Sequence, residues 1–440
     1  MTDWRARVLQ CLDEQTDAMV ANLSDLVREP SLSGSDVENS AQCTLAEVFD
    51  SEGLDTDHWQ IPLEETKADP DFPGMEVTRE EAWGLVGRLP GGGDGPTLML
   101  NGHIDVVPAG QLSTWTHGDP FSGRADAQRV YGRGTCDMKA GLVAALWAIK
   151  ALRRSGAPLR GDVLLASVQG EEDGGLGTFA TLRRGWRADA CVIPEPTSLD
   201  LVPANAGSLT FRLRIAGHAT HASRRTAGVS AIDKFWPVAR ALAELERVRN
   251  ADTHPLFARW DIAYPLSIGI VRAGEWASTV PDLLVAEGRL GVALGEPVAE
   301  ARTALEHAVS EACAADPWLR THPVSVEWWG GQFASGQLAA GSDLLDRLGA
   351  AHVAVTGGVS PQSVWGAPYG SDLRLLTGLA AIPTVHYGPG DVTVAHGPDE
   401  FVPIAEVVTC ARALAALALD YCGTDADGGR AIDGADAQPS

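Results

Sequence analysis

The chain has 440 residues, of which 45% are hydrophobic and 21% are charged, a composition typical of globular proteins with more than one domain. The formal net charge of -24 argues against nucleic acid or an anionic membrane surface as a partner. The N-terminal stretch lacks a signal-peptide core and no apolar run approaches about 18 residues, so we expect a cytoplasmic protein.

The seven cysteines are an odd number and include no Cys-x-x-Cys pair, which indicates reduced and mostly buried thiols. Cys136 stands beside Asp137, and we interpret it as a small packing residue rather than a metal ligand. The candidate metal ligands of this chain are therefore histidines and carboxylates.

The first informative element in chain order is an apolar run, Thr97 to Leu100, which predicts a buried strand and leads to His103 and Asp105. In an extended segment, residues two positions apart project to the same side, so Asp105 can stand behind His103 and hold its ring towards a metal. The alternative interpretation is a hydrogen-bonded histidine at a strand end. A chain with 58 Asp and Glu residues contains such pairs by chance. The motif therefore supports a metal site only together with the other candidate ligands of the chain.

Asp137 precedes a predicted helix, because the apolar positions Leu142, Leu146 and Ile149 recur at helical spacing. One interpretation is an aspartate that caps this helix. A phosphate-binding loop is disfavoured, because the spacing of the preceding glycines fits neither the dinucleotide pattern nor the Walker pattern. Capping and metal binding both remain open for Asp137 at this point.

Two further acidic motifs each follow a predicted buried strand. The run from Val163 to Val168 ends just before Glu171 and Glu172, and the run from Ala190 to Ile193 ends just before Glu195. A parallel sheet places its active-site loops at such strand ends. A solvated acidic turn is the alternative for the two adjacent glutamates.

Together with His396, these residues form a mixture of histidines and carboxylates without paired thiolates. Such a mixture suits Zn²⁺ or Co²⁺ in an open catalytic site rather than in a closed structural site. The sequence therefore predicts a two-metal centre and points to a hydrolase.

Strands and helices alternate up to about residue 205, which predicts an α/β fold with a mostly parallel sheet and helices on both faces. The pattern changes between residues 206 and 329, where strands with one polar face and two helices predict an inserted α+β domain of βαββαβ order. Its predicted strands are 209–215, 283–292 and 324–329, and its predicted helices are 231–248 and 298–314.

The first domain resumes after about residue 330, because His396 has to meet ligands that lie before residue 200. We therefore expect residues 1–205 and 330–422 to form one discontinuous catalytic domain. The tail of residues 423–440 is rich in Gly, Asp and Ala, which predicts disorder.

These motifs resemble the acetylornithine deacetylase, succinyl-diaminopimelate desuccinylase and carboxypeptidase G family of dinuclear zinc amidohydrolases and metallopeptidases. The resemblance covers nearly the whole chain in order. The segments that carry it are Gly102–Asp105, Gly132–Gly141, Glu171-Glu172, Glu195-Pro196, Gly217–Ser223, Gly388–Gly390 and Ala395-His396. It implies a zinc-peptidase-like fold in which the inserted segment is a lid that also joins two copies into a homodimer.

For the metal centre, the resemblance implies two Zn²⁺ ions, for which Co²⁺ can substitute. His103 and Glu195 would bind one ion, and Glu172 and His396 would bind the other. Asp137 would bridge the two ions.

The resemblance also implies that Glu171 is the general base and that Asp105 supports His103. A free carboxylate beside a bound one can take the proton of the attacking water. It can then deliver that proton to the departing nitrogen, which amide cleavage requires.

His221 stands in the inserted segment, where the resemblance implies that it donates a hydrogen bond to the tetrahedral oxyanion, usually in the partner subunit's active site. One such hydrogen bond is worth about 3–4 kcal/mol in the transition state. Without the resemblance His221 would be interpreted as a surface histidine, and His218 is the competing assignment.

Two departures from the family pattern concern the substrate. Relatives that bind an α-carboxylate often carry Asn where this chain has Ser278, and Arg where it has Gly291. Arg289 shares a strand face with Gly291 and can substitute for that arginine. Gly388 and Gly390 are expected to offer backbone donors to a substrate anion, and a simple tight turn is the alternative.

We therefore predict a hydrolase that cleaves the C–N bond of a small N-acylated amino compound, using a zinc-bridging water that Glu171 activates. A dipeptidase or carboxypeptidase is the alternative within the family. A metal-binding protein without turnover is the alternative in another class, and Glu171 argues against it because binding alone needs no free base.

Overall fold

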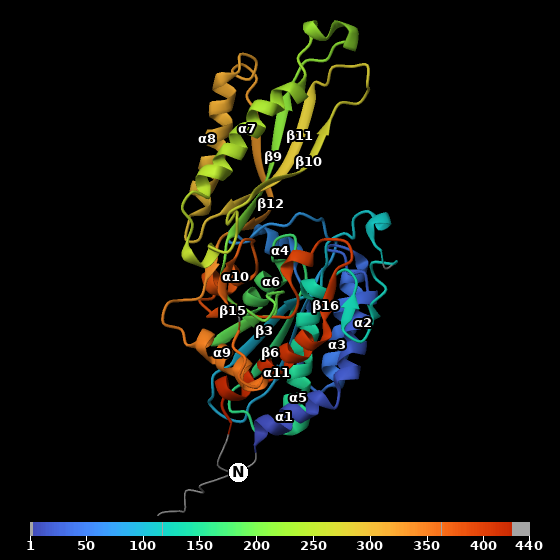
Figure 1. Ribbon diagram of the computed structural model, residues 1–440, viewed down its shortest axis with the longest axis vertical. Helices are drawn as coiled ribbons and strands as arrows, with labels where there is room; N and C mark the ends of the chain where they lie inside the picture. The colour runs from blue at the N-terminus through green and yellow to red at the C-terminus, as the bar shows by residue number, and fades with distance from the viewer. Residues whose placement is uncertain (1–2, 117, 362, 425–440) are drawn as a thin grey trace, which may run out of the picture.

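The computed structural model describes residues 3–116, 118–361 and 363–424. They form an elongated molecule with two parts, a body that contains the large sheet and a lid that rises from one end of the body (Figure 1). The lid is the segment from Gly207 to Phe333, and the body comprises the described residues on either side of it. None of the described helices combines the length and the apolar character that a membrane-spanning helix needs.

The centre of the body sheet consists of parallel strands, in the order β6 (Val163–Val168), β3 (Leu98–His103), β7 (Ala190–Ile193) and β15 (Thr384–His386). The strands outside this centre are β2 (Trp83–Leu89), β1 (Asp55–Gln60), β8 (Leu201–Asn205), β13 (Gly336–Gln337) and β14 (Val364–Ala367). The outer strands β2 and β8 pair antiparallel with the central strands β6 and β15, and β1 and β13 add further antiparallel pairs to β2 and β8. Strand β14 pairs in parallel with β8. The carboxyl ends of the three strands predicted from apolar runs therefore meet at one edge of the sheet.

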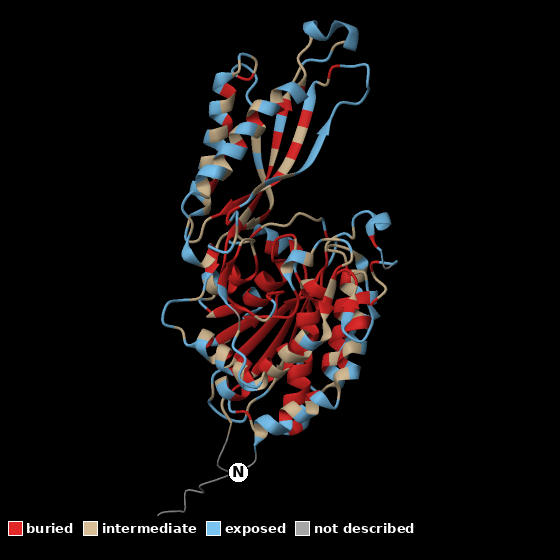
Figure 2. Ribbon diagram, in the orientation of Figure 1, coloured by how far each residue is buried: buried red, intermediate tan, exposed pale blue. Residues whose placement is uncertain are grey.

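Both faces of this sheet are covered, because alternate side chains of each buried strand point to opposite sides. Leu98 and Leu100 pack into one core with α1 (Trp4–Asp13), α2 (Thr16–Arg28), α3 (Asp36–Ser51), α5 (Ala140–Ser155), α9 (Leu344–Val355) and α11 (Ile404–Tyr421). Met99 packs into a second core with α4 (Leu63–Ala68), α6 (Leu176–Arg184) and α10 (Leu373–Leu379). Figure 2 shows the buried residues of these two cores across the body. The predicted α/β architecture is confirmed.

A small three-stranded sheet connects the C-terminal part of the body to the loop before Asp137. In it, β16 (Phe401–Pro403) pairs with β5 (Arg129–Tyr131), and β5 pairs with β4 (Arg124–Ala125). This pairing helps to hold the segment around His396 beside the turn that carries Asp137.

The lid contains a four-stranded antiparallel sheet in the order β10, β11, β9, β12, and α7 and α8 pack on it. Its elements are β9 (Gly207–Ala216), α7 (Ala231–Arg249), β10 (Leu266–Ala273), β11 (Leu283–Val292), α8 (Val298–Ala315) and β12 (Ser325–Phe333). The predicted βαββαβ order matches these elements. No residue range was predicted for β10, because it is an edge strand with mostly exposed residues and no clear alternation.

Two smaller predictions concern the thiols and the tail. All seven cysteines are free and five of them are buried, in agreement with reduced, mostly buried thiols. In the tail, Thr424 pairs with Leu159, and the backbone carbonyl of Gly423 accepts a hydrogen bond from Arg160. Residues 425–440 lie outside the described residues, and so does the prediction that they are disordered.

Candidate metal centre

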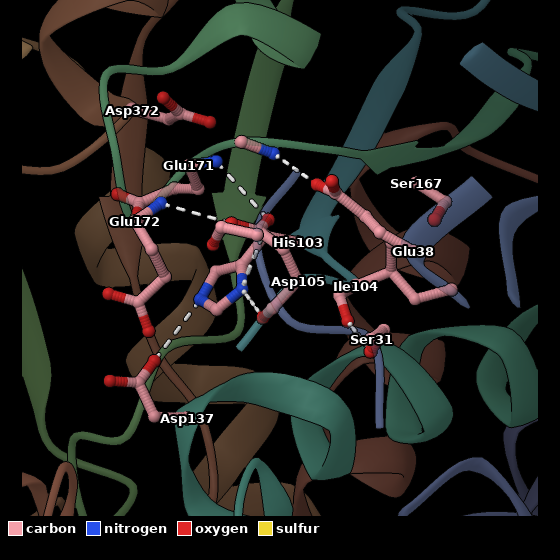
Figure 3. Close-up of polar contacts among 12 residues, drawn as sticks. Ser31, Glu38, His103, Ile104, Asp105, Asp137, Ser167, Glu171, Glu172 and Asp372 are labelled. Atoms are coloured by element: carbon pink, nitrogen blue, oxygen red, sulfur yellow. Dashed lines mark hydrogen bonds and ion pairs between the residues drawn. The ribbon is translucent and has the colours of Figure 1, made fainter. Parts of the chain in front are cut away.

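Three strands of the parallel centre end at predicted site residues. His103 is the last residue of β3, Glu171 and Glu172 follow β6, and Glu195 follows β7. Because parallel pairing sets His103 opposite Val168, the loop after β6 starts beside the histidine. Figure 3 shows the His103 ring between this loop and Asp137.

Asp137 lies in the turn Thr135–Lys139 that leads into α5, and its carboxylate stands between two histidines. Its Oδ1 is 3.1 Å from His103 Nε2, and its Oδ2 is 3.3 Å from His396 Nε2. The N-cap of α5 is Lys139, so Asp137 is not the capping residue of this helix. The two oxygens of Asp137 therefore face two different imidazole rings.

The remaining two predicted ligands extend this arrangement on both sides. His396 Nε2 is 3.2 Å from Oε1 of Glu172, and His103 Nε2 is 3.8 Å from Oε1 of Glu195. His396 has a φ of +59°, a backbone conformation that is uncommon for a residue other than glycine and often marks functional sites. The structure thus brings all five predicted ligands into one cluster, in two groups that share Asp137.

The charge balance of the cluster fits divalent cations. Burial raises the pKa of Glu195 well above its ordinary value, and the charge of Asp137 raises it further. Burial lowers the pKa of His103, but its hydrogen bond with Asp137 and the charge of Glu195 outweigh this effect and raise it. Carboxylates outnumber histidines here, and ligand atoms of His103, Asp137 and Glu172 lie within 4.8 Å of one another.

Asp105 supports the centre differently from the predicted way. The ring nitrogen Nδ1 of His103 is 2.9 Å from the backbone carbonyl oxygen of Asp105 and 3.8 Å from its carboxylate. The carboxylate instead accepts hydrogen bonds from the backbone amides of Glu171, at 3.2 Å, and Glu172, at 3.3 Å (Figure 3). Asp105 therefore holds the histidine through its main chain and the glutamate loop through its side chain.

A buried ion network that the sequence did not indicate holds the same loop from the other side. The Glu38 carboxylate accepts a hydrogen bond from the Gly170 amide at 3.0 Å. Arg79 lies 3.4 Å from Glu38 and donates to Asp173 at 2.8 Å, and all three side chains are buried. Local sequence patterns carry no sign of these contacts, because the partners come from segments far apart in the chain.

Replacing Arg79 by methionine is expected to lower the free energy of unfolding by about 3–5 kcal/mol, because Glu38 and Asp173 would stay buried without their counter-charge. Urea unfolding measures the change. The matched control is Arg247→Met, which removes an exposed ion pair with Glu244 and should change stability by less than about 0.5 kcal/mol. An Arg79→Met protein as stable as the wild type would contradict the role of the network.

Glu400, which the sequence also did not indicate, holds the turn that carries Asp137. Its Oε1 accepts hydrogen bonds from the amides of Cys136, at 2.9 Å, and Asp137, at 3.3 Å. Its other oxygen pairs with Arg133, which is buried. These contacts fix the position of the central carboxylate from the protein interior.

Glu171 differs from its neighbour Glu172. No described residue hydrogen-bonds its carboxylate, whereas Glu172 contacts His396 at 3.2 Å. Burial raises the pKa of Glu171 well above its ordinary value, and the charge of Asp372, a further residue missed in the sequence, raises it further. Glu171 is thus a buried carboxylate beside the cluster, and no described side chain forms a hydrogen bond or an ion pair with it.

A cleft of about 350 Å³ opens over this cluster, between the body and the lid. Its body side includes Asp137, Glu171, Glu172, Glu195, Tyr369 and His396, and its lid side includes Ser208, Ser267, Arg289, Gly291 and Phe333. A volume of this size suits a small molecule rather than a folded protein.

Residues 99–420 match Peptidase family M20/M25/M40. The chain belongs to this family. Membership confirms the resemblance seen in the sequence and makes the chain an M20 hydrolase that acts on amide bonds. The cluster around Asp137 is its candidate metal site.

Two curated relatives span most of this M20 chain. It is 28% identical over 419 residues to N-formyl-4-amino-5-aminomethyl-2-methylpyrimidine deformylase of Bacillus subtilis, which covers 87% of this chain and 89% of that protein. It is 32% identical over 338 residues to succinyl-diaminopimelate desuccinylase of Leptothrix cholodnii, which covers 72% and 80%. Among solved structures, the di-peptidase Dug1p from Saccharomyces cerevisiae aligns with a TM-score of 0.77 at 15% identity, covers 96% and 99%, and supports the fold alone.

Two residues that were predicted to contact the substrate of the M20 chain have other contacts in the structure. Arg289 lines the cleft as expected, but its guanidinium pairs with Glu76 of the body at 2.9 Å. Ser278 is exposed and is not among the residues that line the cleft. Its backbone carbonyl accepts a hydrogen bond from Ala222 at 2.8 Å and so supports the loop of His221.

The expected anion-binding role of the loop at Gly388 and Gly390 is also corrected. The Gly388 amide donates to the Thr197 hydroxyl at 3.0 Å, and the Gly390 amide donates to the Glu406 carboxylate at 2.8 Å. Both donors are engaged inside the protein. The glycines are required instead for close packing, because a Cβ on Gly388 would lie 2.3 Å from the Pro194 carbonyl oxygen.

His221 is exposed on the lid and is not among the residues that line the cleft of its own chain. Its Nδ1 accepts a hydrogen bond from the Ser223 amide at 3.2 Å. The ring proton therefore lies on Nε2, which is a hydrogen-bond donor, whereas Nδ1 is the atom that contacts Ser223. This tautomer is the one that an oxyanion donor needs. Because His221 does not line the cleft of its own chain, its predicted role stays a prediction and requires a second chain.

Proposed function

We propose that this M20 hydrolase is a dinuclear zinc enzyme that removes the acyl group from a small N-acylated amine. The observation that carries the proposal is the central position of Asp137 between His103 and His396. In this proposal His103 and Glu195 would hold one ion, Glu172 and His396 would hold the other, and Asp137 would contact both. A nitrogen and carboxylate donor set of this kind suits Zn²⁺, and Co²⁺ can replace it.

In this account the bound metal ions supply Lewis acidity, which lowers the pKa of water and polarises the amide carbonyl. Glu171 takes the proton of the attacking water, because its carboxylate is engaged by no described side chain. The same carboxylate returns the proton to the departing nitrogen, which cannot leave as an anion. Asp105 keeps both Glu171 and His103 in position during these transfers.

Deacylation is favoured over peptide cleavage by two observations. The relatives named as a deformylase and a desuccinylase cover most of the chain, whereas Dug1p supports only the fold. Arg289, which could bind the α-carboxylate of a peptide, is already paired with Glu76. A dipeptidase or carboxypeptidase activity remains the alternative within the family.

A substrate panel tests the proposal. The zinc-loaded or cobalt-loaded protein is incubated with N-formyl, N-acetyl and N-succinyl amines and with dipeptides, and the release of primary amine is measured. We expect faster release from at least one N-acyl amine than from any dipeptide, with loss of activity after chelation and recovery with metal. Cleavage of dipeptides alone would favour the alternative, and no cleavage of any amide would refute the proposal.

We also propose a homodimer formed through the lid, in the cytoplasm, where the seven free thiols stay reduced. Strand β10 supports this assembly, because it is the edge of the lid sheet and exposes Ile270 and Val271. An exposed edge strand presents unpaired backbone groups to another chain. Such a dimer would allow the Nε2–H of His221 to reach the partner subunit's cleft.

His221→Ala is therefore expected to lower kcat by about 10²–10³-fold with metal content and KM little changed, because the bond strengthens only as charge develops on the oxygen. Mixing inactive His221→Ala subunits with inactive Glu171→Ala subunits should regenerate sites that contain both wild-type residues. Steady-state kinetics before and after subunit exchange measures both effects. Exchange without recovery would contradict a shared site, and an unimpaired His221→Ala enzyme would remove the residue from the mechanism.

A further inference from the structure

Tyr369 carries a buried hydroxyl that has no hydrogen-bond partner among the described residues. It lies in the turn between β14 and α10 and lines the cleft beside Asp137, Glu171 and Glu195. Its aromatic ring packs against the apolar cluster that includes Val202. The ring is thus anchored, while its polar end is left without a partner at the cleft.

A partnerless buried hydroxyl is unusual, because most buried polar groups are hydrogen-bonded and an exception costs stability. The Tyr387 hydroxyl follows the rule in this chain, since it lies 2.7 Å from Nδ1 of the buried His352. A ligand is one group that can supply the missing partner of such an exception. The position of the Tyr369 hydroxyl at the cleft makes the substrate the natural candidate.

The surroundings decide which atom of the substrate this hydroxyl would meet. Burial raises the pKa of Tyr369 well above its ordinary value, and the charges of Glu195, Asp137 and Glu171 act in the same direction. The hydroxyl therefore keeps its proton and acts as a donor. The acceptor that a neutral amide brings to this end of the cleft is its carbonyl oxygen.

We propose that Tyr369 is a catalytic residue that donates its O–H to the carbonyl oxygen of the scissile amide. The proposal rests on the proposed amide hydrolysis and adds a donor from the same chain. Arg289 does not compete for this task because it pairs with Glu76, and His221 lies outside its own chain's cleft. The hydrogen bond strengthens as negative charge develops on the oxygen, so it stabilises the transition state more than the bound substrate.

Tyr369→Phe tests this assignment, because it removes one oxygen and keeps the anchored ring. We expect kcat to fall about 100-fold with KM and metal content little changed. The melting temperature should stay the same or rise, because the lost hydroxyl had no partner in the free protein. A tyrosine with only a structural role would not combine these two responses.

Tyr387→Phe is the matched control, since it removes a buried hydroxyl that is hydrogen-bonded and does not line the cleft. It should lower the melting temperature and leave kcat within about twofold of the wild type. Tyr369→Phe with wild-type kcat would overturn the proposal. A fall in both kcat and melting temperature, or loss of metal, would also overturn it by showing a structural role.

A binding experiment separates this proposal from the proposed function. Calorimetry measures the affinity for a phosphonamidate analogue of an N-acetyl amine, whose tetrahedral oxygens imitate the transition state and whose binding needs no turnover. We expect the Tyr369→Phe variant to bind at least about tenfold more weakly than the wild type. Equal affinities would overturn the role of Tyr369 alone, and failure of the wild type to bind would overturn both proposals.

Discussion

Glu171→Ala is expected to keep both metal ions and to lose about 10²–10⁴-fold in kcat, because the substitution removes the proton carrier and no metal ligand. The neighbouring Glu172→Ala provides the matched comparison, since Glu172 contacts His396 at 3.2 Å and should be needed for one of the ions. The two glutamates sit on one loop that Asp105 holds through both backbone amides, so each variant should keep the fold of that loop.

Metal analysis of the purified proteins, together with steady-state kinetics, distinguishes the two glutamates. Glu171→Ala should contain as much zinc as the wild type and show almost no turnover. Glu172→Ala should contain less zinc. If zinc is lost from Glu171→Ala and retained by Glu172→Ala, the roles of the adjacent glutamates are reversed.

Asp137→Ala is expected to have a broader effect, because the two oxygens of Asp137 face both histidines. The variant should lose both ions and all measurable activity. A ligand that binds only the folded state at 100 times its dissociation constant stabilises that state by roughly 2.7 kcal/mol, so added zinc should raise the melting temperature of the wild type. The same addition should leave Asp137→Ala unchanged.

The control for this experiment is Asp94→Ala, which removes an aspartate whose side chain is 88% exposed. It should bind zinc and respond to it in the same way as the wild type. A zinc-dependent rise in the melting temperature of Asp137→Ala, equal to that of the wild type, would show that Asp137 does not bridge the two ions.

The parts of the site that could be predicted from sequence are those that follow an apolar strand. His103, Glu171 and Glu195 each come just after a short buried run, and parallel strands bring such positions to one edge of a sheet. Glu38, Arg79 and Glu400 could not be found in this way. Each acts on the site from a distant segment, and a charged residue in a helix or loop gives no local sign that it is buried.

The substrate side of the cleft was the least predictable part for a related reason. The pairing of Arg289 with Glu76 depends on how the lid meets a loop of the body. The hydrogen bonds of Gly388 and Gly390 depend on side chains of other elements, one of them far away in the chain. Strand alternation correctly indicated that Arg289 and Gly291 share a face, because both line the cleft. Periodicity therefore predicts the face of a strand but not the partner across a domain boundary.

The central claim is that Asp137 joins two metal ions in one amide-hydrolysing site. Anomalous diffraction at the zinc absorption edge, from crystals of the zinc-loaded protein, tests this claim most directly. The account predicts two zinc peaks about 3.5–4 Å apart, with the Asp137 carboxylate between them and His103 and His396 on different ions. A single zinc peak, or two peaks of which only one contacts Asp137, would contradict it.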